Sequence, residues 1–184
     1  MKNAYHKVQL YSDTKPITVR QYPQPYAIRE IINTEVDKML KNDIICHSTS
    51  PFNSPLLAVP KKPDKNGQPK WRVVIDFRKI NDATISDSYP LPLISDIFDQ
   101  LGRSQYFSTL DMVSGYHQIK MDPCDQHKTA FSTSHGHFEF KRMPFGMKNS
   151  QSTFQRIINN ALIGNLGIKC FVYLDDIIVY GRSL

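Results

Sequence analysis

The sequence predicts an α+β domain in which helices pack on antiparallel strands, and two observations carry the prediction. Apolar residues recur at helical spacing over about 27–42, 94–101 and 150–163. Short runs rich in β-branched and aromatic residues stand between these stretches and after the last of them, as is typical of strands. This order of elements is that of an α+β domain. With 184 residues, 40% of them hydrophobic, the chain can bury one core.

The charge balance favours a polyanionic partner. Lys and Arg number 23 against 17 Asp and Glu, for a formal charge of +6, which suits nucleic acid without proving it. No apolar run approaches the ~18 residues of a membrane-spanning helix, and residues 1–7 are polar where a signal peptide would have an apolar core. We therefore expect an intracellular, cytoplasmic protein with no membrane partner.

The first part of the chain predicts a helix followed by a hairpin. Residues 1–25 are polar and carry three prolines, which favours an extended lead-in that packs on other elements. The helical pattern of 27–42 stops at Asn42 and Asp43. A short apolar strand follows at 56–59, and the basic stretch 61–70 then forms a turn before the next strand.

The strand predicted over 71–77 has one core face and one charged face. Alternate residues of a strand share a face, which sets Trp71, Val73, Ile75 and Phe77 against Arg72, Val74, Asp76 and Arg78. A Lys-rich turn with Arg72 at its base is either an ordinary solvated loop or a hairpin that leans over phosphates. In the second case Arg72 would offer its planar fork of donors.

The middle of the chain predicts a helix and then a strand that ends on an acid. Ile94 to Leu101 form the helix, and Gly102 suits its C′ position. The next strand ends on Asp111, and Gly115 then permits a tight turn just before Tyr116. From the local pattern alone, the more common case is an aspartate that ends a strand and a tyrosine that belongs to the core.

Two further strands and a helix precede the last hairpin. Residues 129–131 and 138–140 predict paired strands around a turn. Residues 143–146 form a sharp loop, and Asn149 or Ser150 caps the helix that follows.

The last hairpin places two adjacent carboxylates, Asp175 and Asp176, between the apolar runs 168–172 and 177–180. Like charges this close repel unless a positive group lies beside them, although aspartate is also a common turn residue. If the strand that ends on Asp111 lies in the same sheet, three carboxylates converge at one edge. Hard oxygen ligands select Mg²⁺ or Mn²⁺, and a pair of such ions supports in-line phosphoryl transfer.

Several motifs follow one another along the chain: Lys61-Lys62, Trp71 to Asn81, Leu110 to Ile119, Met143 to Asn149, Thr153 to Arg156 and Tyr173 to Asp176. Their order resembles that of the motifs of a reverse transcriptase. Over nearly its whole length, the chain most resembles the reverse transcriptase domain of gypsy-type LTR retrotransposon (retrovirus-related) Pol polyproteins.

The resemblance implies a right-hand polymerase fold with fingers and an incomplete palm, the palm being an antiparallel sheet backed by helices. Fingers would occupy about 1–86 and 119–147, and palm about 87–118 and 148–184. The thumb, connection and RNase H domains would be absent from the chain.

The implied activity is that of an RNA-directed DNA polymerase, a nucleotidyltransferase that adds dNMP to a primer 3′-hydroxyl by two-metal phosphoryl transfer. Its partners would be an RNA or DNA template with primer, dNTPs and the remaining segments of the Pol polyprotein. The cofactor would be two Mg²⁺ ions, with Mn²⁺ as a substitute. A virus-like particle or the nucleus would be further locations.

The resemblance also implies a role for individual residues. Asp111 and Asp175 would bind the metals directly, with Asp176 beside them and the backbone carbonyl of Met112 as an added ligand. Lys61 and Arg72 would bind the triphosphate, and Phe145 and Gly146 would complete the nucleotide pocket. Tyr116 would lie under the sugar as a steric gate. Arg78 would lie near the template, and Tyr173 would lie under the primer end.

Two other hypotheses remain at this stage. A catalytically inactive, truncated remnant would only bind nucleic acid or retain the fold. An RNA-templated RNA polymerase would share the paired acids, but a bulky Tyr116 below the sugar argues against it.

Overall fold

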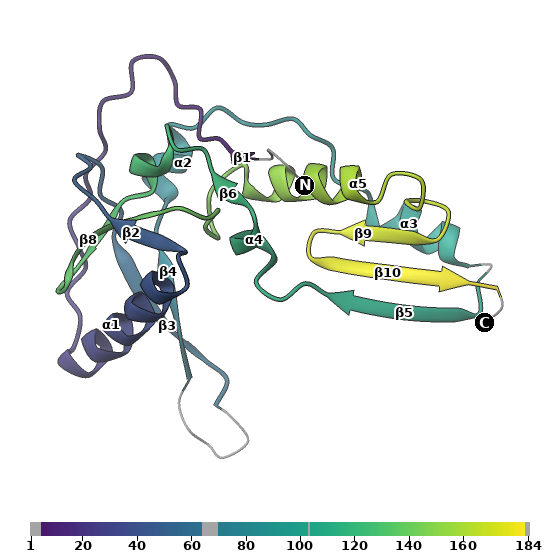
Figure 1. The fold of residues 1–184 in the computed structure, drawn as a ribbon, viewed down its shortest axis with the longest axis horizontal. Coiled ribbons are helices and arrows are strands. Elements are labelled where there is room, and N and C mark those ends of the chain that lie inside the picture. Colours follow the sequence, from purple (N-terminus) through teal and green to yellow (C-terminus); the bar gives the residue numbers. More distant parts are fainter. Residues whose placement is uncertain (1–4, 64–69, 103, 183–184) are drawn as a thin grey trace.

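The computed structural model of the chain describes residues 5–63, 70–102 and 104–182. The helices labelled in Figure 1 are α1 (Tyr26–Lys41), α2 (Arg78–Asp82), α3 (Ile94–Leu101), α4 (Gly115–Gln118) and α5 (Ser150–Ala161), and η1 (Gln126–Thr129) is a 3₁₀ turn. The strands are β1 (Tyr5–His6), β2 (Ile45–His47), β3 (Leu56–Lys61), β4 (Lys70–Ile75), β5 (Tyr106–Asp111), β6 (Lys120–Met121), β7 (Phe131–Thr133), β8 (Gly136–Phe140), β9 (Cys170–Tyr173) and β10 (Asp176–Gly181).

The elements form two lobes (Figure 1). One lobe contains the β2–β8–β7 sheet and the β3–β4 hairpin, with α1 beside them. The other contains the β5–β10–β9 sheet with α3 and α5. The β1–β6 pair is parallel, whereas the strand pairs in the other three sheets of the described residues are antiparallel. The α+β prediction is therefore confirmed.

The larger core fills the first lobe and continues to α5. Phe77, Phe131 and Phe138 are fully buried in it, and α1 contributes Ile32 and Val36. Because these two residues are four apart, they lie on one face of the helix, which accounts for the apolar spacing in the sequence. The predicted helices over 27–42, 94–101 and 150–163 are confirmed within one or two residues at each end.

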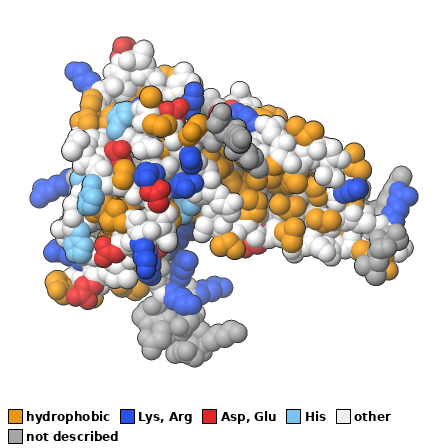
Figure 2. All heavy atoms as spheres, viewed as in Figure 1, with side chains coloured by type: hydrophobic (Ala, Val, Ile, Leu, Met, Phe, Trp, Pro, Cys, Tyr) orange, Lys and Arg blue, Asp and Glu red, His pale blue; other side chains and the backbone are white. Residues whose placement is uncertain are grey.

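The second lobe has a small core between α3 and the sheet. Ile97 and Leu101 of α3 pack against Phe171 of β9. Strand β5 lies at the edge of this sheet, and all six of its residues are exposed. Figure 2 shows hydrophobic side chains gathered on this lobe, whereas Lys and Arg side chains cluster on the other.

Three local predictions are wrong. The strand predicted over 71–77 ends at Ile75, because the Asp76 carboxylate accepts the backbone N–H of Arg78 and the chain turns into α2. Gly102 has a right-handed helical backbone conformation with φ −60°. It therefore does not end α3 as the predicted left-handed C′ glycine. The strand predicted over 129–131 starts at Phe131, since Thr129 belongs to η1.

Asn149 stands at the N-cap position of α5, but its side chain does not cap the helix. Its amide donates to the carbonyl of Ile85 at 2.7 Å and accepts the N–H of Asp87 at 3.0 Å. The predicted basic turn over 61–70 lies partly outside the described residues, which omit 64–69. None of the helices in the described ranges is long and apolar enough to cross a membrane.

The extended lead-in predicted over 1–25 is confirmed for residues 5–25, since residues 1–4 lie outside the described ranges. It is joined to the first lobe by the Val19 N–H, which donates to the carbonyl of Asn53 at 2.8 Å, and to α5 by His6. Strand β1 pairs with β6, and His6 is buried, with its Nδ1 2.9 Å from the Thr153 hydroxyl of α5. Burial lowers the pKa of His6 to about 4, although the negative charges of Asp125 and Asp87 oppose this shift. His6 therefore folds in its neutral form.

We expect the fold to lose stability as the pH falls from 6.5 towards 4. Unfolding returns His6 to its ordinary pKa of 6.5, so over this range the unfolded chain binds the proton more readily. His6 makes its full contribution to the free energy of unfolding above pH 6.5. Lowering the pH to 4 should reduce the free energy of unfolding by about 3 kcal/mol. Urea unfolding at pH 7.5 and pH 5 measures the loss.

The variant His6→Gln should show a smaller loss of stability between these two pH values, because glutamine does not titrate. His135→Gln is the matched control, since His135 is exposed. An unchanged pH dependence in His6→Gln would contradict the assignment.

Candidate active site

Two distant aspartates are direct neighbours in the second lobe. The β5–β10 register pairs Asp111 with Asp176, and the backbone N–H of Met112 donates to the carbonyl of Asp175 at 3.3 Å. The end of β5 therefore lies beside the turn between β9 and β10. Three acidic residues from two segments meet at one end of the sheet.

The backbone of the acidic turn, residues 173–176, is strained, and α5 supports it through hydrogen bonds. Leu174 has φ 55°, a left-handed conformation that costs a non-glycine residue about 1–2 kcal/mol. The Leu174 N–H donates to Gln155 Oε1 at 2.8 Å, and Gln155 Nε2 donates to the carbonyl of Val172 at 3.0 Å. Gln155 is fully buried, so its two hydrogen bonds are shielded from water and hold the backbone of the turn in place.

The donors at this edge suit a hard divalent cation. Asp111 and Asp176 are exposed and Asp175 is half-buried, so their carboxylate oxygens are accessible. Within the described ranges no three His, Cys, Asp or Glu side chains are gathered closely enough to enclose a metal by themselves. Uncompensated carboxylates repel one another. A cation that binds here must therefore draw them together, with help from oxygens of the backbone or a substrate.

Tyr116 lies between the acidic edge and the other lobe. It belongs to the single-turn helix α4, which follows Ser114 in a left-handed conformation with φ 49°. Burial raises the pKa of its hydroxyl, and the negative charge of Asp175 adds to this effect. Its ring is stacked on Phe154 and tilted against Phe145, with centroid distances of 5.0 and 4.6 Å.

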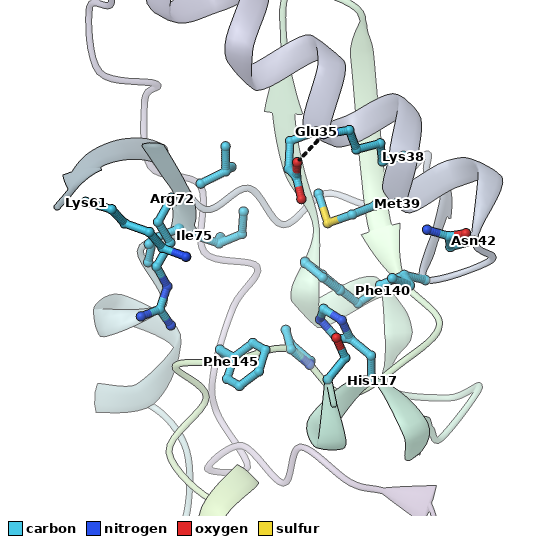
Figure 3. A pocket seen from close by; sticks show the side chains of 15 residues that line it. Glu35, Lys38, Met39, Asn42, Lys61, Arg72, Ile75, His117, Phe140 and Phe145 are labelled. Atoms are coloured by element: carbon cyan, nitrogen blue, oxygen red, sulfur yellow. Dashed lines mark hydrogen bonds and ion pairs between the residues drawn. The ribbon is translucent and has the colours of Figure 1, made fainter. Parts of the chain in front are cut away.

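A cavity of about 520 Å³ opens beside these residues, between the β3–β4 hairpin, α1 and α4 (Figure 3). Lys61 and Arg72 enter it from the hairpin, and Phe145 lies below them. The Arg72 guanidinium carbon is 5.8 Å from the centre of the Phe145 ring, within the range of a cation–π contact. Lys38 and Glu35 of α1 also line the cavity and pair with each other at 3.4 Å, so Lys61 and Arg72 leave the lining with a net positive charge. Together with the aromatic face of Phe145, this suits an anionic ligand that carries a ring.

His117 lies at the floor of the same cavity and was not among the predicted site residues. Its ring meets Phe145 edge-on at 5.3 Å. Burial lowers its pKa, and the charge of Glu35 across the cavity only partly opposes this. The imidazole is therefore neutral near pH 7 and adds hydrogen-bonding capacity without charge.

The loop that carries Phe145 and Gly146 is fixed by α2. The Asn81 side-chain amide donates to the carbonyl of Gly146 and accepts the N–H of Lys148, both at 2.8 Å. Gly146 has φ 86°, a conformation that favours glycine. Asn81 thereby orients Phe145 towards Arg72, a role that its position in the sequence did not reveal.

Two predicted site residues lie apart from the cavity. Arg78 is on another face of the first lobe, where its guanidinium bonds the Asp76 carboxylate at 2.7 Å and, with Tyr22, lowers the pKa of Asp76 to about 2. Tyr173 pairs with Asp176 across the hairpin and packs on the small core of the second lobe. The β5–β10 register places Asp111 beside Asp176, with Asp175 next along the chain. The cavity separately gathers Lys61, Arg72 and Phe145, and Tyr116 contacts Phe145 and is influenced by the charge of Asp175.

Comparison with known proteins now identifies the chain. A family model described as "Reverse transcriptase (RNA-dependent DNA polymerase)" matches residues 59–184. The chain belongs to the reverse transcriptase family. The chain is 50% identical over 169 residues to the Retrovirus-related Pol polyprotein from transposon 297 of Drosophila melanogaster, and the match covers 92% of this chain and 16% of that protein. It is 45% identical over 172 residues to the Pol polyprotein from transposon gypsy of the same organism, with coverage of 93% and 17%.

A solved structure agrees in fold. The foamy viral protease-reverse transcriptase in complex with RNA/DNA hybrid is 27% identical to this chain, with a TM-score of 0.86, and the match covers 100% of this chain and 24% of the foamy viral chain. The predicted resemblance to gypsy-type Pol polyproteins and the polymerase fold are thus confirmed. The family consists of nucleotidyltransferases and is generally metal-dependent. The chain spans less than a fifth of the two transposon polyproteins.

Proposed function

We propose that this chain supplies the nucleotide-binding fingers and part of the palm of an RNA-directed DNA polymerase. Residues of about 1–86 and 119–147 serve as fingers, and those of about 87–118 and 148–184 as palm. The observation that carries the proposal is the pairing of Asp111 with Asp176, next to a cavity that Lys61 and Arg72 line.

Metal binding in this proposal uses only hard oxygen donors. Asp111 and Asp175 hold two Mg²⁺ ions, for which Mn²⁺ can substitute, with Asp176 and the carbonyl of Met112 beside them. When bound, such a pair of ions makes the primer 3′-hydroxyl a better nucleophile and neutralises the leaving pyrophosphate. Gln155 keeps the acidic turn in place for this purpose, through its two hydrogen bonds.

The remaining residues position the substrates. Lys61 and Arg72 bind the triphosphate, and Arg72 offers a planar fork whose orientation Phe145 supports from below. Phe145 and Gly146 complete the nucleotide pocket, and Tyr116 lies under the sugar, where a ribose 2′-hydroxyl would clash. The template passes near Arg78, and Tyr173 packs under the primer end.

The partners in this proposal are an RNA or DNA template with its primer, dNTPs and the other segments of a Pol polyprotein. The solved foamy viral structures with RNA/DNA hybrid and with ds DNA support the nucleic-acid partners by similarity. We propose that the protein is located in the cytoplasm, because RNA template and dNTPs are found in the cytoplasm. It would also associate with a virus-like particle or with the nucleus.

Primer extension tests the proposal. Oligo(dT) on poly(rA) is incubated with dTTP and Mg²⁺, with this chain and with a longer polypeptide that continues into the next segment of the polyprotein. We expect incorporation of dTMP that EDTA abolishes, at least by the longer form. Salt-sensitive binding of the hybrid without incorporation by either form would instead indicate a catalytically inactive remnant and would overturn the proposal.

A further inference from the structure

We propose that Phe154 is a positioning residue for sugar selectivity, because it fixes the ring of Tyr116 from below. This inference deepens the proposed function and rests on it, since the contact of Tyr116 with the sugar belongs to that proposal. Phe154 lies on α5, 38 positions after Tyr116, and its contacts with α4 carry the argument.

The backbone of α4 rests directly on the Phe154 ring. A Cβ atom at Gly115 would lie only 2.8 Å from Phe154 Cζ, closer than real Cβ atoms approach. Phe154 therefore occupies the space that a side chain at position 115 would need. The distance between α5 and the start of α4 is set by this contact, and Tyr116 is the next residue along the chain.

The ring of Tyr116 lies flat on the same phenylalanine. The Tyr116 and Phe154 rings are 5.0 Å apart at an angle of 5°, so they are stacked over their faces. On its other side Tyr116 meets Phe145, which is 40% exposed, whereas Phe154 is only 1% exposed. The surrounding core therefore restricts the Phe154 ring more than it restricts the Phe145 ring. Phe154 is thus the fixed floor of the stack.

The same helix also fixes the acidic turn. Gln155, the residue after Phe154, bonds the backbone of Val172 and Leu174. Adjacent residues of α5 therefore support the two parts of the site. Phe154 supports Tyr116, and Gln155 supports the turn that carries Asp175 and Asp176. Repulsion between atoms rises steeply once they overlap, so a small shift of the tyrosine relative to the acidic turn changes the space left for a 2′-hydroxyl.

The test compares dUTP with UTP, which differ only in the 2′-hydroxyl. In Phe154→Leu the flat floor is lost and Tyr116 can recede, so we expect the ratio of UTP to dUTP incorporation to rise about tenfold. Tyr116→Val is the positive control and should raise the ratio at least as much. Trp71, the single tryptophan, precedes Arg72 on β4, so its fluorescence reports the Kd of each nucleotide without catalysis.

Phe131→Leu is the matched control. Phe131 is also fully buried, but its ring packs against Phe138 and Phe140 in the first lobe, whereas the ring of Phe154 stacks on Tyr116. We expect it to leave the UTP to dUTP ratio unchanged, which separates positioning from a general loss of packing. Phe154→Met serves if Phe154→Leu does not fold, since Met fills the volume without a flat face and should shift the ratio in the same direction. Circular dichroism identifies which variants are folded.

The outcomes separate the two proposals. An unchanged ratio in a folded Phe154 variant, while Tyr116→Val raises it, would reject the role of Phe154 and leave the proposed function intact. An equal rise in Phe131→Leu would also reject it. If the wild-type chain and its longer form neither bind nor incorporate dUTP, the proposed function fails and this inference fails with it.

Discussion

The substitution Asp175→Asn should reduce nucleotide incorporation by about a thousandfold or more, because it removes the charge that holds a metal and leaves the shape of the side chain. Asp111→Asn should have an effect of the same size, since the two residues lie at the ends of neighbouring segments. Single-turnover primer extension at saturating dTTP measures the loss.

The same variants should not unfold the chain. Without a cation the carboxylates repel one another, so the unfolding free energy of Asp175→Asn in EDTA should be equal to or above that of the wild type. Asp99→Asn, on the exposed surface of α3, is the matched control and should retain full incorporation. Undiminished incorporation by Asp175→Asn would rule out the metal-binding role of this residue.

A second large effect is expected at Gln155, and it should appear in stability as well as in activity. Gln155→Leu leaves the Leu174 N–H and the Val172 carbonyl without their present partner in a buried place, which should cost about 2–4 kcal/mol. The left-handed Leu174 then loses its support, so the acidic turn should shift and the Mg²⁺ concentration for half-maximal incorporation should rise.

Gln151→Leu provides the comparison for this second prediction. Gln151 lies on the same helix but is exposed, so the same chemical change should alter the unfolding free energy by less than about 0.5 kcal/mol. Urea unfolding and a Mg²⁺ titration of primer extension measure the two effects. Equal stabilities of the two variants would show that the hydrogen bonds of Gln155 do not hold the turn.

The sequence was sufficient for the acidic edge because its information is local and periodic. The strand pattern predicted β5 up to Asp111, and it predicted β9 and β10 within two residues at each end. The convergence of the aspartates was predicted on the condition that β5 lies in the same sheet as the hairpin, and the pairing of Asp111 with Asp176 meets this condition. The same reasoning extended β4 too far, to Phe77. Side-chain alternation does not show that Asp76 accepts a backbone N–H and starts a helix.

The supports of the site could not be predicted in this way. Gln155, Asn81 and His6 act through one or two side-chain hydrogen bonds each, to partners 17 to 147 positions away. Periodicity records which face of an element is apolar, but it carries no information about such partners. Phe154 was expected as part of the apolar pattern of α5 and of the motif Thr153 to Arg156, but its stacking on Tyr116 was not predicted, because it depends on how two distant elements pack.

Strand β5 has a practical consequence for all of these measurements. Its outer edge presents backbone groups that can pair with a strand of another molecule, and Phe107 and Leu110 are each more than half exposed. An exposed apolar edge of this kind favours self-association between copies. The chain should therefore be handled at low protein concentration, with its aggregation state recorded beside each activity, so that lost solubility is not mistaken for lost catalysis.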